Sequence, residues 1–143
     1  GLPFGAVSEP RNMINISRVL VYKIGGAVEL PIVETVEETL ATPKLAQGTA
    51  EQVEAGRAVF NGLCVVCHGG NAISAGLVPD LRYRIDTIAP AWQAIVMDGG
   101  LQVNGMPAWK DYMTNEESEA IKAYVVHEAK LGHERGEKRI VRK

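Results

Sequence analysis

The pentapeptide Cys64-Val65-Val66-Cys67-His68 constrains the fold of this chain more than any other feature. It contains both cysteines among the 143 residues. Two intervening residues place both sulfurs on one side of a helical turn, where each can form a thioether with a vinyl group of the same porphyrin. The next residue, His68, can then put an imidazole nitrogen on the iron. The pentapeptide therefore predicts one covalently attached haem c, held by Cys64 and Cys67 with His68 as an axial ligand.

Three other uses of a Cys-x-x-Cys pair fit the chain less well. A disulfide between Cys64 and Cys67 would close too short a loop to stabilise the chain much, because the loop-closure term grows with loop length. A thioredoxin-like dithiol is expected in a βαβ context that the following sequence does not supply. Zinc would have to recruit His127 and His133, and 59 residues separate Cys67 from His127. The usual loop of a zinc finger has about 12 to 15 residues.

Length and composition indicate one compact domain with extensions. A hydrophobic content of 46% and a formal net charge of −2 give no bias toward nucleic acid. No apolar run approaches the roughly 20 residues of a membrane span. The start of the chain, Gly-Leu-Pro-Phe, lacks the regions of a signal peptide. Because thioether attachment of haem normally takes place outside the cytoplasm in bacteria, we expect a periplasmic protein whose signal peptide lies upstream of Gly1.

The N-terminal residues 1–48 are expected to lie outside the compact part. Residues 1–17 are rich in Gly, Pro, Ser and Asn and predict a loop. From Arg18 to Ile24 β-branched and aromatic residues predict a strand that stops at Gly25-Gly26. Its partner is either a local hairpin with Val28–Val33 or a sheet outside this chain. Residues 29–48 have the composition of a semi-extended linker.

The compact part, residues 49–131, begins at Thr49-Ala50-Glu51-Gln52, a capping box that predicts a helix to about Cys64. Its buried face has apolar residues and one glycine at helical spacing: Val53, Gly56, Val59, Phe60 and Leu63. Glycine inside a helix costs about 1 kcal/mol relative to alanine. Gly56 therefore indicates either a second helix in close backbone contact or simple tolerance.

Two further helices are predicted. One covers Ile88–Asp98, with Pro90 in its first turn and Gly99-Gly100 as its stop. The other starts at a second capping box, Thr114 with Glu117, and runs to about Lys130, where Gly132 would end it. Residues 132–143 are predicted to be a basic, mobile tail.

The sixth iron ligand is expected from the loop between these two helices. Asn104-Gly105-Met106-Pro107 presents a methionine between turn-forming residues. The thioether is a soft ligand, and His/Met ligation raises the reduction potential of a haem into the range of electron carriers. The competing candidates are Met97, Met113, His127 and His133. Met97 lies on a predicted helix and Met113 adjoins a helix cap, so Met106 is preferred.

Two further side chains are candidates for the haem edge. A buried haem keeps two propionates that need hydrogen-bond donors. Arg82 directly follows the Pro79-Asp80-Leu81 turn and could supply one donor, and the indole of Trp92 could supply a second. The alternatives are a solvated Arg82 and a core Trp92.

In their order along the chain, these motifs resemble a class I cytochrome c domain over residues 49 to about 131. The motifs that carry the resemblance are Ala55-Gly56-Arg57-Ala58-Val59-Phe60, Cys64-Val65-Val66-Cys67-His68-Gly69, Val78-Pro79-Asp80-Leu81, Gly105-Met106-Pro107, and a closing helix with Tyr124. The resemblance implies an all-α fold of three main helices around a covalently bound haem.

The same resemblance assigns roles to individual residues. It implies that the first and last helices cross at Gly56, with Phe60 and Tyr124 at the crossing. It implies that the carbonyl of Pro79 accepts a hydrogen bond from the second nitrogen of His68, which would make the ligand more electron-rich. It also includes Leu81 among the haem-binding residues.

A narrower resemblance extends over nearly the whole chain. The segments Val78-Pro79-Asp80-Leu81-Arg82-Tyr83, Ala91-Trp92-Gln93-Ala94-Ile95-Val96 and Asp98-Gly99-Gly100 are similar to the C-terminal cytochrome domain of PQQ-dependent quinohaemoprotein alcohol dehydrogenases. Arg18 to Gly26 resembles the last strand of their propeller, and Glu29 to Gly48 resembles the linker. The propeller with its PQQ, calcium and catalytic carboxylate is absent from this sequence, so we expect no alcohol oxidation by the chain alone.

Two functions follow as expectations. The chain is an electron-transfer domain that accepts electrons from a reduced PQQ-bearing dehydrogenase domain and passes them to a small soluble redox protein or a membrane oxidase. The alternative is a free-standing cytochrome c shuttle. An enzymatic haem site, such as a peroxidase, would need an open sixth position and a distal acid or base, and Met106 is expected to fill that position.

Overall fold

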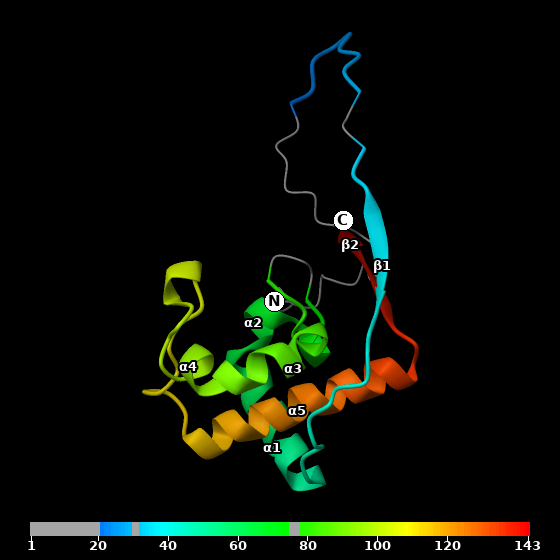
Figure 1. The fold of residues 1–143 in the computed structure, drawn as a ribbon. Coiled ribbons are helices and arrows are strands. Elements are labelled where there is room, and N and C mark those ends of the chain that lie inside the picture. The colour runs from blue at the N-terminus through cyan, green and yellow to red at the C-terminus, as the bar shows by residue number, and fades with distance from the viewer. Residues whose placement is uncertain (1–20, 30–31, 75–77) are drawn as a thin grey trace.

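The computed structural model describes residues 21–29, 32–74 and 78–143. A helical body carries a two-stranded sheet that extends from one end of the longest helix, and residues 21–29 lie beyond the sheet (Figure 1). Within the described ranges, no helix has the length and apolar character needed to cross a membrane.

The first helix, α1 (Ala50–Leu63), begins as its capping box predicts. The Thr49 hydroxyl accepts a hydrogen bond from the Gln52 amide at 3.2 Å, and the Gln52 side chain accepts one from the Thr49 amide at 2.9 Å. These two bonds satisfy backbone donors that have no partner inside the helix. Cys64 is the C-cap, so the helix ends where the cysteine motif begins.

The last helix, α5 (Asn115–Glu134), also starts at its predicted capping box, formed by Thr114 and Glu117. The prediction that Gly132 ends this helix is wrong. Gly132 is a buried position inside the helix, where an added Cβ would lie 2.6 Å from Leu40 Cδ2 and 3.2 Å from Arg82 Nη1. A glycine at this position therefore permits close packing rather than a helix stop.

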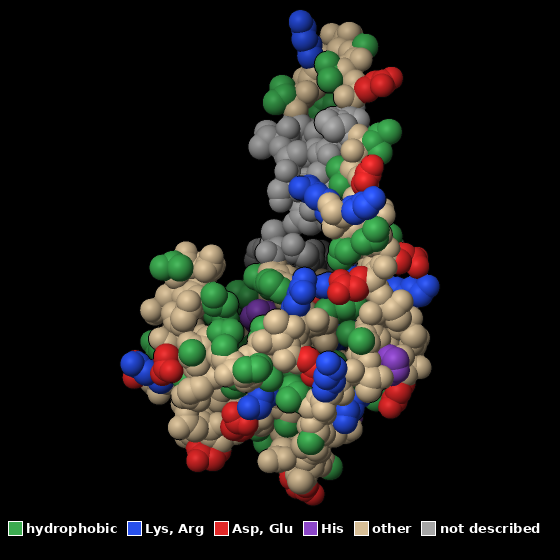
Figure 2. Space-filling view, in the orientation of Figure 1, with side chains coloured by type: hydrophobic (Ala, Val, Ile, Leu, Met, Phe, Trp, Pro, Cys, Tyr) green, Lys and Arg blue, Asp and Glu red, His purple; other side chains and the backbone are tan. Residues whose placement is uncertain are grey.

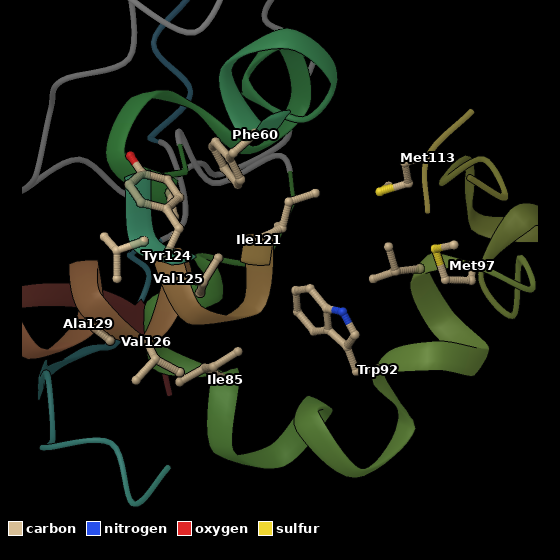
Figure 3. Packing of buried hydrophobic residues seen from close by; sticks show 13 residues of the cluster. Phe60, Ile85, Trp92, Met97, Met113, Ile121, Tyr124, Val125, Val126 and Ala129 are labelled. Carbon is tan, nitrogen blue, oxygen red and sulfur yellow. The ribbon is translucent and has the colours of Figure 1, made fainter. Parts of the chain in front are cut away.

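The crossing of α1 and α5 is confirmed at the predicted residues (Figure 1). Gly56 is buried, and a Cβ on it would lie 1.9 Å from the carbonyl oxygen of Ala120 in α5. The rings of Phe60 and Tyr124 pack beside this contact with centroids 5.3 Å apart and a tilt of 59° (Figure 3). The helices can approach so closely only because residue 56 has no side chain.

The single helix predicted over Ile88–Asp98 is instead broken into short pieces. The structure has α3 (Ile85–Ile88), a 3-10 turn (Ala89–Ala91) and α4 (Trp92–Val96). Pro90 lies in the 3-10 turn, and its missing N–H removes a hydrogen bond that a continuous helix would need. The chain turns after α4 at Gly99-Gly100, as predicted.

The main hydrophobic core lies where these helices meet. Its larger members are Phe60, Ile85, Trp92, Val96, Met97, Met113, Ile121, Tyr124, Val125 and Val126 (Figure 3). The remaining elements of the body are the one-turn helix α2 (Val65–His68) and short 3-10 turns at Gly70–Ala72, Leu81–Tyr83 and Gln102–Asn104.

A two-stranded antiparallel sheet lies outside the predicted domain 49–131, within which every described element is helical, as the all-α expectation requires. Strand β1 (Thr35–Thr39) pairs with β2 (Lys138–Arg142), with Thr35 opposite Arg142 and Thr39 opposite Lys138. The predicted linker and the predicted mobile tail are thus partners of one another. The physical reason is charge complementarity, since Lys138 binds Glu37 at 3.1 Å and Arg139 binds Glu38 at 2.5 Å.

The strand predicted over Arg18–Ile24 is not formed in its described part, residues 21–24. Residues 21–26 contain a turn in which the Gly26 amide binds the carbonyl of Lys23 at 3.0 Å. Val21, Tyr22 and Ile24 are almost fully exposed. The alternative hairpin with Val28–Val33 is not formed either, since the described residues 28, 29, 32 and 33 are not in a strand. Residues 18–20 and 30–31 lie outside the described part.

The helix crossing makes opposite predictions for two glycines of α1. Gly56→Ala should lower the free energy of unfolding by about 1 to 3 kcal/mol, because the new methyl group would overlap the Ala120 carbonyl. Gly62→Ala is the matched control, since no atom lies within 4 Å of the new Cβ. The control should raise the free energy of unfolding by up to about 1 kcal/mol through helix propensity. Urea denaturation measures both, and a Gly56→Ala protein as stable as its parent would contradict the crossing.

Candidate functional site

The cysteine motif is folded as a single helical turn directly after α1. The amides of Cys67 and His68 both donate to the carbonyl of Cys64, at 3.2 Å and 2.9 Å. Both cysteines have free thiols, with Cys64 half-buried and Cys67 exposed. The turn ends at Gly69, whose φ is +74° and where a Cβ would lie 2.1 Å from the Ile73 carbonyl oxygen. The pentapeptide is thus held as the compact turn that attachment to one porphyrin requires.

The ionisation of the motif argues against a dithiol redox centre. Burial, together with the neighbouring Cys67, raises the pKa of Cys64 to about 12. Reactive dithiols have cysteines whose pKa is lowered below the ordinary value. Burial lowers the pKa of His68, which keeps its imidazole neutral at neutral pH. The neutral imidazole is the form that binds a metal ion.

The Nδ1 atom of His68 is buried and has no hydrogen-bond partner among the described residues. The predicted hydrogen bond to the carbonyl of Pro79 is therefore not formed, and Pro79 is exposed. That prediction came from the order of motifs, which does not fix the path of the loop between His68 and Pro79. A buried polar nitrogen without a partner is costly, so the site favours a ligand that engages this half-buried ring.

Several apolar side chains that pack against the core are only partly buried. They pack against the buried cluster yet keep exposed surface, and include Val65, Leu81, Ile88, Ile95, Met106 and Trp109. Figure 2 shows hydrophobic side chains gathered around one histidine in a hollow of the face that it draws. A large, flat apolar group would cover such a surface. Together with the free thiols and the neutral imidazole, these residues fit a covalently bound haem.

Met106 differs from the other candidate methionines in its environment. It follows a 3-10 turn and Gly105, whose φ is +92°, and its amide donates to the carbonyl of Leu101 at 3.2 Å. Its side chain is partly buried at the edge of the core. Met97 and Met113 are 2% and 7% exposed and lie inside the hydrophobic cluster (Figure 3). The loop position predicted for Met106 is therefore present, and its role as a ligand stays a prediction.

The other candidate ligands have partners within the protein. His127 Nδ1 lies 3.1 Å from Gln47 Nε2, and His133 Nδ1 lies 2.9 Å from the carbonyl oxygen of Leu40. Both histidines are on α5. In the described part of the chain, no three His, Cys, Asp or Glu side chains are grouped closely enough to hold a metal ion. The zinc alternative thus has no support there.

Arg82 and Trp92 use their polar groups within the protein. The guanidinium of Arg82 is buried and binds Asp80 at 2.8 Å and Glu137 at 2.6 Å. The indole Nε1 of the buried Trp92 donates to the hydroxyl of Ser118 at 2.9 Å. These contacts give the predicted propionate roles no support, and the roles stay predictions. Trp92 is a core residue, which was the alternative considered for it.

Glu137 is the residue of this region that sequence reasoning missed. It was assigned to a mobile tail, and 55 positions separate it from its partner Arg82. The available signal was an acidic residue inside a basic segment, but nothing in the local sequence indicates which cation it would meet.

Comparison with known proteins agrees with this site. A family model described as cytochrome c oxidase, cbb3-type, subunit III matches residues 51–125, inside the domain predicted over 49–131. The quinohemoprotein alcohol dehydrogenase ADH IIB of Pseudomonas putida is 39% identical over 115 residues, which are 80% of this chain and 17% of that protein.

A solved structure and a shorter relative add to this. The structure of quinohemoprotein alcohol dehydrogenase ADHIIG from Pseudomonas putida HK5 matches with a TM-score of 0.61 and 32% identity, over 75% of this chain and 15% of that one. The chloroplastic cytochrome c6 of Chlamydomonas reinhardtii is 34% identical over 101 residues, 63% of this chain and 64% of its own length.

This chain therefore spans less than a fifth of each dehydrogenase and resembles their C-terminal cytochrome c domain. The family model covers more than half of the chain and includes the Cys-x-x-Cys-His motif. The chain belongs to the cytochrome c family that this model describes, whose domains carry covalently bound haem c.

Proposed function

We propose that this chain is an electron-transfer domain with the class I cytochrome c fold, in which Cys64 and Cys67 attach the haem and His68 and Met106 are its axial ligands. The observation that carries the proposal is the half-buried, neutral imidazole of His68, directly after the second of two free thiols, whose buried Nδ1 has no partner among the residues that the structure describes. The crossing of α1 and α5 at Gly56 supports the class I fold.

Bound haem c supplies a one-electron redox couple at this site. Cys64 and Cys67 anchor the group from one helical turn, and His68 presents its neutral nitrogen from the same turn. Leu81 and the other half-buried apolar side chains exclude water from the site, which favours a higher reduction potential. Met106 contributes a soft thioether from the loop that follows the 3-10 turn Gln102–Asn104.

We infer that the electron donor is a PQQ-bearing dehydrogenase domain and that the acceptor is a small soluble redox protein or a membrane oxidase in the periplasm. The support for the donor is that the matched relatives are quinohemoprotein alcohol dehydrogenases in which the matched part is a minor share. The exposed apolar residues Val21, Tyr22, Ile24 and Val28 precede the helical body and suit contact with a further domain.

A free-standing cytochrome c shuttle is the second candidate. The observation in its favour is the similarity to cytochrome c6 of Chlamydomonas reinhardtii, of which this chain matches a much larger share. The two candidates agree on the haem site and differ in the donor.

Covalent attachment of the haem is tested by measuring the mass of the protein with mass spectrometry. The chain expressed with a bacterial haem-maturation system should carry one haem that acid-acetone extraction does not remove, because two thioether bonds hold it. The double variant Cys64→Ser/Cys67→Ser should carry none. Val66→Ser, between the two cysteines and exposed, is the matched control and should retain the haem. Retention of covalent haem by the double variant would refute the attachment site.

Ligation by Met106 is tested with variants that conserve volume. Met106→Leu should change the ferric absorption spectrum, open the iron to added ligands and lower the reduction potential, because leucine has no thioether. Met97→Leu and Met113→Leu replace buried core residues and should leave the spectrum and potential unchanged. A Met106→Leu protein that matches its parent in both measurements is not compatible with this ligand.

The donor is tested in the gene and then in the protein. The reading frame upstream of Gly1 should encode propeller repeats, and the full-length protein should reduce its haem on addition of an alcohol and PQQ. The isolated chain with bound haem should not respond to the alcohol. An upstream frame that encodes only a signal peptide would favour the free-standing shuttle instead.

A further inference from the structure

The C-terminal segment 135–142 contacts the turn that contains Leu81. Arg82 Nη1 donates to Glu137 Oε2 at 2.6 Å, while Arg82 Nη2 and Nε donate to the Asp80 carboxylate at 2.8 Å and 3.1 Å. The next residue, Tyr83, lies under the guanidinium of Arg139, whose Cζ is 4.0 Å from the ring centroid. Two consecutive residues of the turn are thus held by residues from the other end of the chain.

The charges of this cluster are buried, which makes each partner necessary. The side chains of Arg82, Asp80 and Glu137 are 4%, 9% and 8% exposed. Arg135 also binds Glu137, at 2.8 Å, so that two guanidinium groups face two carboxylates. Removing one partner from such a group leaves an uncompensated charge in a poorly hydrated place.

The cluster also fixes the conformation of the turn. The Asp80 carboxylate accepts a hydrogen bond from the Arg82 amide at 3.1 Å and so caps the 3-10 turn Leu81–Tyr83. Leu81 lies between Asp80 and Arg82. It packs against the hydrophobic cluster, as do Cys64 and Met106. Under the proposed function Leu81 lines the haem, and its position at the edge of the core depends on the anchoring of Asp80 and Arg82.

We propose that Glu137 is a positioning residue of the haem site, which acts through Arg82 to hold the turn Asp80–Tyr83 and thereby Leu81 in place. The inference rests on the proposed function, since it concerns a haem held by Cys64, Cys67 and His68. The C-terminal segment 135–142 then supports the haem site, although it is far from the cysteine motif in the sequence.

The ionisation of Glu137 agrees with this role. Burial alone would raise the pKa of its carboxyl group, but hydrogen bonds and charge from Arg82 and Arg135 outweigh that effect and lower the pKa. The carboxylate therefore stays charged at neutral pH and available to Arg82.

The test uses the complete chain with covalently attached haem and compares three variants. Glu137→Gln removes the charge and keeps the shape, Glu137→Asp keeps the charge on a shorter side chain, and Glu134→Gln is the matched control at an exposed position near the end of α5. The readouts are the reduction potential and the NMR signals of the Leu81 methyl groups, recorded well below the melting temperature.

Glu137→Gln should lower the reduction potential and shift the Leu81 signals, because a loosened turn admits water to the apolar side of the site. The Arg82 amide hydrogen should exchange at least about tenfold faster. Glu137→Asp should give smaller shifts in the same direction, and it keeps the test decisive if the glutamine variant does not fold. Glu134→Gln should match the parent.

Two outcomes overturn the inference in distinguishable ways. A haem-loaded Glu137→Gln protein that is less stable but keeps the parent's potential and Leu81 signals would mean that Glu137 stabilises the fold only, and the proposed function would stand. A parent chain that attaches no haem would overturn the proposed function, and the inference with it.

Discussion

The contact between α1 and α5 at Gly56 is the constraint on which the rest of the structure depends. Because a Cβ there would lie 1.9 Å from the Ala120 carbonyl, the two backbones touch, and the crossing point cannot slide along either helix. The helix α1 ends seven residues later, at Leu63, and the turn with both cysteines follows at once. The crossing therefore fixes the place and direction in which the cysteine motif leaves the body. A shift of one helical turn would carry His68 away from the apolar side of the core.

A second constraint is electrostatic and acts at the opposite end of α5. Arg82 is buried between Asp80 and Glu137, and Gly132 allows the helix to approach its guanidinium. Buried charges tolerate little misplacement, because their solvation has been lost and only well-placed partners replace it. The cluster thus specifies one arrangement of two distant segments, residues 80–83 and 132–137, whereas the apolar core would accept several side-chain packings. The paired charges of the β1–β2 sheet extend the same principle to the surface, where each pair contributes less.

Sequence reasoning succeeded where the signal is local and failed where it is not. Both capping boxes, the stop at Gly99-Gly100 and the cysteine motif consist of residues within a few positions of each other, so their hydrogen bonds follow from spacing alone. The helix expected over 88–98 failed because Pro90 was treated as a first-turn residue although helical residues precede it. The sheet was missed because its strands are far apart in sequence: the paired residues Glu38 and Arg139 are 101 positions apart. Each strand by itself has the sequence of a charged, irregular segment. Glu137, the distant partner of Arg82, was missed for the same reason.

The sheet also bears on the reach of the donor domain that the proposed function implies. From Glu34 onward the chain is held along the body: β1 pairs with β2, the Leu40 amide donates to the Glu137 carbonyl at 2.9 Å, and the Lys44 amide donates to Asp86 at 3.0 Å. If the proposed donor domain ended before Gly26, eight residues (26–33) would separate it from the sheet region. Eight residues span at most about 26 to 29 Å when fully extended. A free linker over residues 29–48 has 20 residues and would have allowed more than twice that reach. Under the proposed function, the pairing of β1 with β2 would therefore keep such a donor domain near the sheet.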